Sequence, residues 1–510
     1  MAEKFYITTA IDYVNGRPHL GHAYEKVLTD MLARYERRKG KGVFFLTGVD
    51  EHGMKVQQSA AAQNREPQDL ADENAARFRA LYDELDVGYD DFVRTTEDRH
   101  KQVVQRILQE LFDKGEIYEG QYEGFYSAKQ EQFLTDDDKV DGEWPADFGE
   151  VVHLQEKVYY FKLSQYQDWL VGFLNENPDW IYPSFRTKEV LGKLDQPIPD
   201  MCISRPSSRL SWGIPLPFDK DQVTFVWFDA LINYISVIGY EGGQVGDWWP
   251  AVHVIGKDIM APAHAVYWPI MLKAIGVPMP QRLLVHGFWT MDQAKMSKSE
   301  GNVVDPLELV EVYGRDAFRY YVLREMALGQ DADFSLDQFH QRYQSELGNN
   351  LGNLLNRTVS MIGRYRDGAV PQQVNGSELE TAMKADVLAS ISKYRELMDQ
   401  WQVHLALTEL WKGITRTNQY IEEAAPWKLA KDEARAERLD CVLNHMATAL
   451  WMLGSELQPI LPDSVERIFA QLHLDQPLDH AVELNWPQWE STASVGKPEP
   501  LYPRIEREES

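Results

Sequence analysis

Residues 5–40 read FYITTAIDYVNGRPHLGHAYEKVLTDMLARYERRKG, and this stretch decides the fold. Its first seven residues are mostly β-branched or aromatic, which predicts a buried strand. A loop with the turn pair Asn15-Gly16 comes next. From Leu20 onward, apolar residues recur every three or four positions as far as Lys39 and Gly40, which predicts a helix with one apolar stripe.

A second unit of the same kind follows directly. Residues 43–47 form another apolar run, and GVDEHG at 48–53 separates it from a further helical stretch. Alternating strands and helices predict a parallel sheet, whose ligands bind at the carboxyl ends of the strands. The loops 12–18 and 48–53 lie at those ends. Further apolar strands are predicted at 223–228, 252–256 and 283–287.

Composition shifts divide the rest of the chain. Residues 115–212 are crowded with aromatics and carry the acidic run 136–138, which predicts a domain inserted into the α/β domain. After about Ser345, long helical stripes predict a helix bundle. The residues from Ser491 onward are rich in proline and read as a tail or strap.

Composition also excludes several classes of protein. The chain has 510 residues, which predicts three or four domains. No apolar run approaches the ~20 residues that span a bilayer, and no secretion signal opens the chain. The cysteines, Cys202 and Cys441, are too few for a disulfide framework. We therefore expect a cytoplasmic protein without membrane contact. The net charge of −27 means that any nucleic acid must be bound by local basic patches.

The first candidate motif is His19-Leu20-Gly21-His22, at the start of the predicted helix. A helix amino terminus attracts phosphate, and two histidines on one helix face can donate to phosphate oxygens. Gly21 would let a nucleotide approach the backbone. Alone, the motif is equally compatible with a pair of surface histidines or half of a metal site.

The second candidate motif is Lys295-Met296-Ser297-Lys298-Ser299, after the predicted strand at 283–287. Two ammonium groups and neighbouring hydroxyls on one loop suit a triphosphate whose charge shifts during reaction. Such a loop, met alone, is more often merely solvated.

The two motifs together resemble the paired motifs of class I aminoacyl-tRNA synthetases. Longer blocks resemble the methionyl-tRNA synthetases within that class, and they occur in family order. These blocks are AIDYVNGRPHLGHAYE (10–25), FLTGVDEHG (45–53), ISRPSSRLSWGIPLP (203–217), VWFDALINYIS (226–236), HVIGKDI (253–259) and HGFWTMDQAKMSKSEGNVVDP (286–306).

The resemblance implies an α/β Rossmann-type catalytic domain with an inserted domain, followed by an all-α anticodon-binding bundle. The expected segments are 1–114 and 213–290 (catalytic halves), 115–212 (inserted connective domain), 291–345 (KMSKS loop and stem contact), 346–490 (anticodon-binding domain) and 491–510 (tail). It also implies a two-step reaction. Methionine and ATP form methionyl-adenylate, and a ribose hydroxyl of tRNA(Met) then takes the methionyl group.

Residue roles follow from the resemblance, position by position. Catalysis on the phosphates of ATP, with Mg²⁺ as counter-ion, is expected from His19, His22, Lys295 and Lys298. ATP contacts are further expected from Gly21, Gly256 and Asp258. Asp50 is expected to hold the methionine ammonium, in a pocket of Ile11, Tyr13, Trp227, Ala230, Tyr234, Ile259 and His264. Aromatic edges favour sulfur, although aromatics at such spacing are more often plain core.

Two positions depart from the family pattern. The family commonly has a cysteine-bearing zinc knuckle in the inserted domain, whereas residues 115–212 contain only Cys202. We therefore expect no zinc. The family histidine usually stands five residues after the aspartate of the KDI block, whereas His264 stands six after Asp258. An insertion near Pro262 could be absorbed at the helix start.

In the helical segment, Asn353, Arg357 and Trp427 match family positions that read the anticodon. Without the resemblance, a solvated helix face and a core tryptophan would be the better interpretation of these residues. The extra carboxy-terminal tRNA-binding domain found in some members is missing, so we expect a monomer. The rival hypotheses are a class I synthetase for another apolar amino acid, a small nucleotidyl transferase and a non-catalytic, synthetase-like RNA-binding protein.

Overall fold

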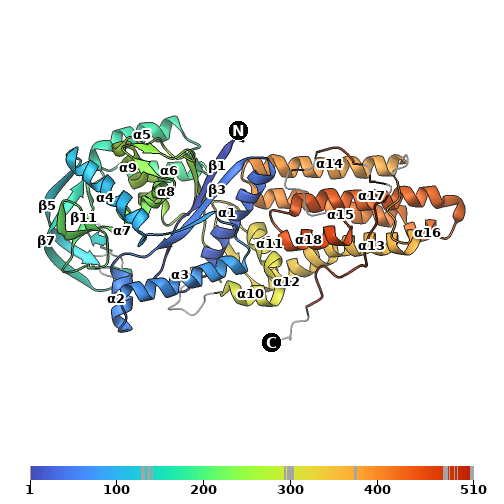
Figure 1. Cartoon of the computed structure of the whole chain (residues 1–510), viewed down its shortest axis with the longest axis horizontal. Helices are drawn as coiled ribbons and strands as arrows, with labels where there is room; N and C mark the ends of the chain where they lie inside the picture. The colour runs from blue at the N-terminus through green and yellow to red at the C-terminus, as the bar shows by residue number, and fades with distance from the viewer. Residues whose placement is uncertain are drawn as a thin grey trace.

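The computed structural model shows an elongated molecule, with an α/β half at one end and a bundle of helices at the other (Figure 1). The structure describes residues 2–127, 132–134, 139–140, 142–291, 294–295, 304–372, 376–474, 481, 483–487, 489–490 and 492–505. Within those residues, no helix combines the length and the apolar character that crossing a membrane requires.

A parallel sheet of seven strands is the centre of the α/β half. The strands run in the order β2-β3-β1-β15-β16-β8, and β4 also pairs with β3. Every pairing in the sheet is parallel, as the alternation of strands and helices predicts. The strands are β1 (Lys4–Thr9), β2 (Asp12–Tyr13), β3 (Gly42–Asp50), β4 (Asp91–Arg94), β8 (Ile181–Tyr182), β15 (Ala251–Gly256) and β16 (Arg282–His286). The predicted Rossmann-type fold class is confirmed.

One predicted strand is wrong. Residues 223–228 were expected to form a strand of the main sheet. Instead, β12 (Asp219–Thr224) ends there and α7 (Val226–Leu231) begins, because the backbone turns at Phe225. β12 belongs to a separate antiparallel sheet with β10 (Ser204–Pro206) and β11 (Pro215–Leu216). An apolar run this short has the same periodicity in a buried strand and in a buried helix.

Helices cover the main sheet on both faces, and two large apolar cores result. One core joins α1 and the sheet to the helical half, from Phe5 through Tyr394 to Leu501. The other core lies under α4, α9 and the inserted segment. The helices of the α/β half are α1 (Leu20–Arg38), α2 (Met54–Ala62), α3 (Pro67–Glu84), α4 (Asp98–Asp113), α8 (Asn233–Ser236) and α9 (Trp268–Ile275).

The segment 115–212 builds an antiparallel sheet of its own, in the order β6-β5-β7-β9. It also supplies β8, which pairs with β16 and so extends the main sheet. Its elements are β5 (Ile117–Ser127), β6 (Gln132–Leu134), β7 (Val151–Phe161), β9 (Met201–Cys202), α5 (Gln167–Glu176) and α6 (Phe185–Leu194). A small hairpin follows, of β13 (Tyr240–Glu241) and β14 (Gln244–Val245).

The chain then passes through a small sheet and three helices into the bundle. These connecting elements are β17 (Trp289–Met291), β18 (Ala294–Lys295), β19 (Ala332–Phe334), α10 (Pro306–Tyr313), α11 (Arg315–Glu325) and α12 (Leu336–Arg342). The bundle consists of η5 (Tyr343–Gly352), α13 (Asn353–Arg366), α14 (Glu378–Asp399), α15 (Val403–Ala424), α16 (Pro426–Leu429), α17 (Ala436–Leu457) and α18 (Pro462–Gln471).

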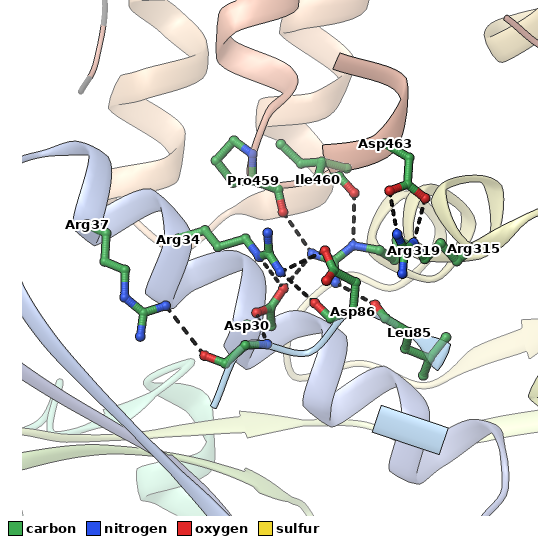
Figure 2. A network of polar contacts seen from close by, with 11 residues as sticks. Asp30, Arg34, Arg37, Leu85, Asp86, Arg315, Arg319, Pro459, Ile460 and Asp463 are labelled. Carbon is green, nitrogen blue, oxygen red and sulfur yellow. Dashed lines mark hydrogen bonds and ion pairs between the residues drawn. The ribbon is translucent and has the colours of Figure 1, made fainter. Parts of the chain in front are cut away.

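A buried ion pair fixes α1 to the helical half (Figure 2). Arg319, fully buried in α11, donates to Asp30 of α1 at 2.6 Å. Its other N–H groups bond the carbonyl oxygens of Leu85, Pro459 and Ile460 at 2.9–3.1 Å. One guanidinium therefore joins α1, the end of α3 and the turn between α17 and α18.

Replacing Arg319 tests this junction. Removing one partner of a buried ion pair leaves an uncompensated charge, so Arg319→Met should lower the free energy of unfolding by about 3–5 kcal/mol. Arg315 is the matched control, because its bidentate pair with Asp463 is part-exposed (31% and 41%), and Arg315→Met should cost ~1 kcal/mol or less. If denaturant titrations gave equal losses of unfolding free energy for the two variants, the larger contribution expected of Arg319 would be contradicted.

Candidate active site

A cavity of about 700 Å³ opens at the carboxyl ends of β1, β3, β15 and β16. This is the position at which parallel sheets bind ligands. The cavity brings together all the residues expected to hold methionine, which are Ile11, Tyr13, Asp50, Trp227, Ala230, Tyr234, Ile259 and His264. The residues expected at ATP also line it, namely His19, Gly21, His22, Gly256 and Asp258.

The two motif histidines cap α1 and stack on each other. The Nδ1 atom of His19 accepts from the backbone N–H of Gly21, and the Nδ1 atom of His22 accepts from the N–H of His19, both at 3.1 Å. Each neutral ring therefore carries its proton on Nε2. The ring centroids lie 3.7 Å apart. The backbone thus orients two N–H donors at the amino end of a helix, where phosphate binds.

Two glycines at the cavity have a steric reason to be glycine. A Cβ atom on Gly21 would lie 3.1 Å from the His19 ring, so the glycine makes room for the stacked imidazole. A Cβ atom on Gly256 would lie 2.6 Å from an oxygen of Asp258. Both glycines therefore allow a neighbouring polar side chain to fold over the backbone beside the cavity.

His264 reaches the cavity in spite of its extra residue. The chain there makes a wide turn at the start of η4 (Met260–Tyr267), in which Ala261 is extended and the N–H of His264 bonds the carbonyl of Ile259 five residues back. Such a π-type turn accommodates one residue more than an α-helical turn. The wide turn thus lies at the helix start, where the sequence analysis expects the extra residue; that expectation stays a prediction.

Burial keeps His264 neutral, and its hydrogen bonds fix its tautomer. Its Nδ1–H donates to the Ile259 carbonyl at 2.9 Å, so its Nε2 accepts from the Tyr234 hydroxyl at 2.7 Å. Burial lowers the pKa of His264 to about 4. A second buried histidine, His253, packs its ring 4.1 Å from that of Tyr234, and burial also lowers its pKa. This wall of the cavity is polar but uncharged at neutral pH.

Asp50 lines the same cavity from the end of β3. Its residue is 8% exposed, and the residue after it, Glu51, is fully buried. Glu51 accepts from Arg94 at 2.8 Å and from the hydroxyl of Thr96. These bonds fix the peptide that presents the Asp50 carboxylate to the cavity.

A buried charge network under the first motif was missed by sequence reasoning. Lys26, fully buried, donates to Asp12 at 2.7 Å and to Glu25 at 3.0 Å. Glu25 also bonds His286 at 3.0 Å. Burial alone would raise the pKa of Glu25, but Lys26 and His286 together lower it to about 2. Asp12, Glu25 and His286 all line the cavity, and the only sequence signal was their place inside the two motif blocks.

The lysines of the second motif were only partly located. Lys298 lies outside the described residues. Lys295 belongs to β18, of which the structure describes the backbone alone. Within the described part of the chain, no group of three or more His, Cys, Asp and Glu side chains could hold a metal ion.

The three helical-domain candidates lie near the far end of the bundle. Arg357 of α13 packs its guanidinium 5.8 Å from the centre of the Trp427 ring in α16, and it pairs with Glu422 at 2.7 Å. Asn353 precedes Arg357 by one helical turn and is exposed. Trp427 is half-buried against the main core, so one part of its ring is packed and another is accessible.

Comparison with known proteins gives a consistent result over the whole chain. Residues 5–150 and 148–359 match the family described as "tRNA synthetases class I (M)". Residues 370–510 match the "Anticodon binding domain of methionyl tRNA ligase". The methionine–tRNA ligase of Halalkalibacterium halodurans is 42% identical over 99% of this chain and 79% of its own length. That of Bacillus subtilis is 41% identical over 99% of this chain and 78% of its own.

Solved structures agree with the sequence relatives. A Mycobacterium tuberculosis methionyl-tRNA synthetase in complex with methionyl-adenylate superposes with a TM-score of 0.93 at 35% identity, covering 98% of this chain and 100% of that one. The free-state structure of the M. tuberculosis enzyme gives a TM-score of 0.87 at 32% identity, covering 100% and 99%. Fold, cavity and relatives together show that the chain belongs to the methionyl-tRNA synthetases, the class I enzymes that ligate methionine to tRNA.

Proposed function

We propose that methionine and ATP react in this cavity to form methionyl-adenylate, and that the helical half binds the anticodon end of tRNA(Met). The observation that carries this proposal is the convergence of Asp50, the Tyr234–His264 pair and the histidine motif on one cavity. The relative bound to methionyl-adenylate supports it, because its chain superposes along the whole length of this one.

In this proposal, the carboxylate of Asp50 and an uncharged wall of the cavity hold methionine. Asp50 receives the ammonium group. The thioether lies among Tyr13, Trp227 and Tyr234, with Ile11, Ala230 and Ile259 completing the apolar surface. A neutral His264 suits this role, since a charged ring would favour water over the thioether.

The phosphates of ATP lie at the amino end of α1. The carboxylate of methionine attacks the α-phosphate and pyrophosphate leaves, so no covalent enzyme intermediate forms. His19 and His22 donate from Nε2 to the phosphate oxygens on which charge develops, and Lys295 and Lys298 neutralise the leaving group. Gly256 and Asp258 lie beside the adenosine ribose. The Asp258 carboxylate can accept hydrogen bonds from the ribose hydroxyls.

Loss of one phosphate donor should slow the first step alone. His22→Ala is expected to raise the barrier to adenylate formation by ~2.7–4 kcal/mol, because one preorganised donor is lost. Lys298→Ala should raise the same barrier by a similar amount. Methionine binding without ATP should stay unchanged in both variants. Stopped-flow adenylation at the wild-type rate would contradict the assigned roles.

Mg²⁺ would enter this site as a partner of the triphosphate. The described residues offer no cluster of protein ligands for it, and Mg²⁺ usually binds through substrate phosphates. Its chemistry there would be to neutralise charge on the β- and γ-phosphates.

Zinc is not needed in this proposal, since the inserted segment has only Cys202. Activity should therefore survive dialysis against a zinc chelator once Mg²⁺ is restored. Elemental analysis provides the independent measurement. Stoichiometric zinc, lost together with activity on dialysis, would show that ligands other than cysteine build a site in this chain.

The anticodon is read in this proposal by Asn353, Arg357 and Trp427. Unstacked bases bind to aromatic rings and guanidinium planes, and Arg357 and Trp427 place one of each side by side. Recognition by so few groups suits a chain with a net charge of −27, which repels the rest of the tRNA backbone. We further propose that the enzyme is cytoplasmic and acts as a monomer. Light scattering would test the monomeric state.

Trp427→Ala separates anticodon recognition from packing. Base–aromatic stacking is worth ~1–3 kcal/mol, so charging of tRNA should fall by about fivefold to 150-fold while pyrophosphate exchange stays intact. A purely packing role predicts instead a loss of about 3–5 kcal/mol in stability and damage to both reactions. Melting temperature and both activities should be measured on one preparation.

Arg357→Ala is the control for this experiment. Its ion pair with the exposed Glu422 adds about 1 kcal/mol or less to stability, so folding should not change. Charging should still fall. Full charging by this variant, on a tRNA with the methionine anticodon, would refute the anticodon assignment.

A further inference from the structure

A buried carboxylate lies behind the cavity without lining it. Asp229 stands in α7 between Trp227 and Ala230, which both line the cavity. Residues 227 and 230 share one face of a helix, and residue 229 faces away from it. Asp229 is fully buried, so it can influence a ligand in the cavity only through other residues.

Two imidazoles bind this carboxylate, one on each oxygen. The Nδ1 atom of His52 lies 2.6 Å from one oxygen, and the Nε2 atom of His100 lies 2.7 Å from the other. Burial alone would raise the pKa of Asp229, but the two histidines lower it below its ordinary value. Hydrogen bonds to an ionised carboxylate are roughly twice as strong as neutral ones. Asp229 therefore holds both imidazoles firmly, and we call Asp229, His52 and His100 together the tether.

The bond to His52 connects the end of β3, which carries Asp50, with α7, which carries Trp227. His52 follows Asp50 by two residues, and the intervening Glu51 is bound to Arg94. The peptide that presents Asp50 is thus held by Arg94 on one side and by Asp229 on the other. Asp229 itself sits on the helix that presents Trp227.

The bond to His100 extends the tether to a third element. The Nδ1 atom of His100 lies 2.9 Å from the hydroxyl oxygen of Ser236. That hydroxyl belongs to α8 (Asn233–Ser236), the short helix that also carries Tyr234. One carboxylate is therefore linked, directly or through one histidine, to the elements that carry Asp50, Trp227 and Tyr234.

We propose that Asp229 is a positioning residue that sets the spacing between Asp50 and the Trp227–Tyr234 wall, and thereby the affinity for methionine. This inference rests on the proposed methionine cavity. In the proposed function ATP lies at the histidine motif, Gly256 and Asp258, which belong to the start of α1 and the end of β15 and not to the elements that Asp229 joins. The effect of Asp229 should therefore be selective for the amino acid.

The test is Asp229→Asn, which keeps the shape and removes the charge that binds both imidazoles. Pyrophosphate exchange is measured with methionine and ATP varied in turn. The KM for methionine should rise about tenfold, while kcat and the KM for ATP stay within about twofold, because only binding of the amino acid is weakened. Calorimetric titration with methionine alone should show the same loss of affinity.

Asp316→Asn is the matched control. Asp316 is another buried carboxylate (5% exposed, against 0% for Asp229) that accepts from the backbone N–H of Ser464 at 2.6 Å in the junction with the bundle. A general loss of packing would change both variants alike. Under the proposal, the methionine KM of the Asp316 variant stays normal.

A double variant with Trp227→Ala identifies the route. If Asp229 acts by placing Trp227, the effect of Asp229→Asn on the methionine KM should shrink when Trp227 is absent. Full additivity would overturn the proposed route. If Asp229→Asn fails to fold, His52→Gln breaks only one of the two bonds and should raise the methionine KM in the same selective way.

The outcomes separate this inference from the proposed function. A raised methionine KM in Trp227→Ala beside a normal one in folded Asp229→Asn overturns the inference alone. A normal methionine KM in Trp227→Ala overturns the proposed cavity, and the inference with it. Equal rises in the KM values for methionine and ATP in Asp229→Asn would show a general disturbance and also overturn the inference.

Discussion

Helix α1 is the element on which the rest of the structure depends, and buried charge holds it in place. Its amino end carries His19 and His22, and its middle is fixed by Lys26 and Asp30. A helix rises 1.5 Å per residue, so about 12 Å separate His22 from Asp30. A buried ion is costly unless its partners surround it. Lys26 has two carboxylates and Asp30 has Arg319 and Arg34, so the position of α1 is tightly specified.

This arrangement connects the cavity and the helical half through one helix. The bonds of Lys26 fix Asp12 and Glu25 at the cavity, and the bond of Asp30 to Arg319 fixes the turn at Pro459 and Ile460 in the helical half. The apolar core is also continuous from β1 to the bundle. Apolar packing alone keeps α1 and the helical half together but lets them slide past each other. The four directed hydrogen bonds of the Arg319 guanidinium allow only one orientation between them.

Much of this could be predicted from sequence because the signals were local. Periodicity located β1, α1 and β3, and the motif blocks contained every predicted residue that lines the cavity except His264. The blocks at 10–25, 45–53, 253–259 and 286–306 lie at strands of the parallel sheet, whereas the block at 226–236 lies on α7 and α8, after β12 of the separate sheet. The prediction failed at 223–228, where an apolar run gave no period and α7 formed instead. It also missed β8, because a two-residue edge strand inside an inserted segment gives no pattern.

Buried polar groups were the other part that sequence could not supply. Lys26, Arg319 and Asp229 read as ordinary charged residues, since a sequence does not show which charge will lie inside. Their partners are 14, 289 and up to 177 residues away, so only the folded chain brings them together. His264 is a middle case, in which the motif predicted the residue and the structure supplied the wide turn that places it.

The cavity combines two electrostatic requirements that usually conflict. An ammonium group needs a carboxylate, whereas a thioether needs a wall without charge. The structure separates them by keeping Asp50 at the end of β3 and by keeping His264 and His253 neutral through burial. A further carboxylate close to the cavity, Asp229, faces away from it and is bound by two imidazoles. In the proposed function, the charge of Asp50 therefore acts on the ligand directly, whereas the charge of Asp229 acts from behind, through the elements that carry Asp50, Trp227 and Tyr234.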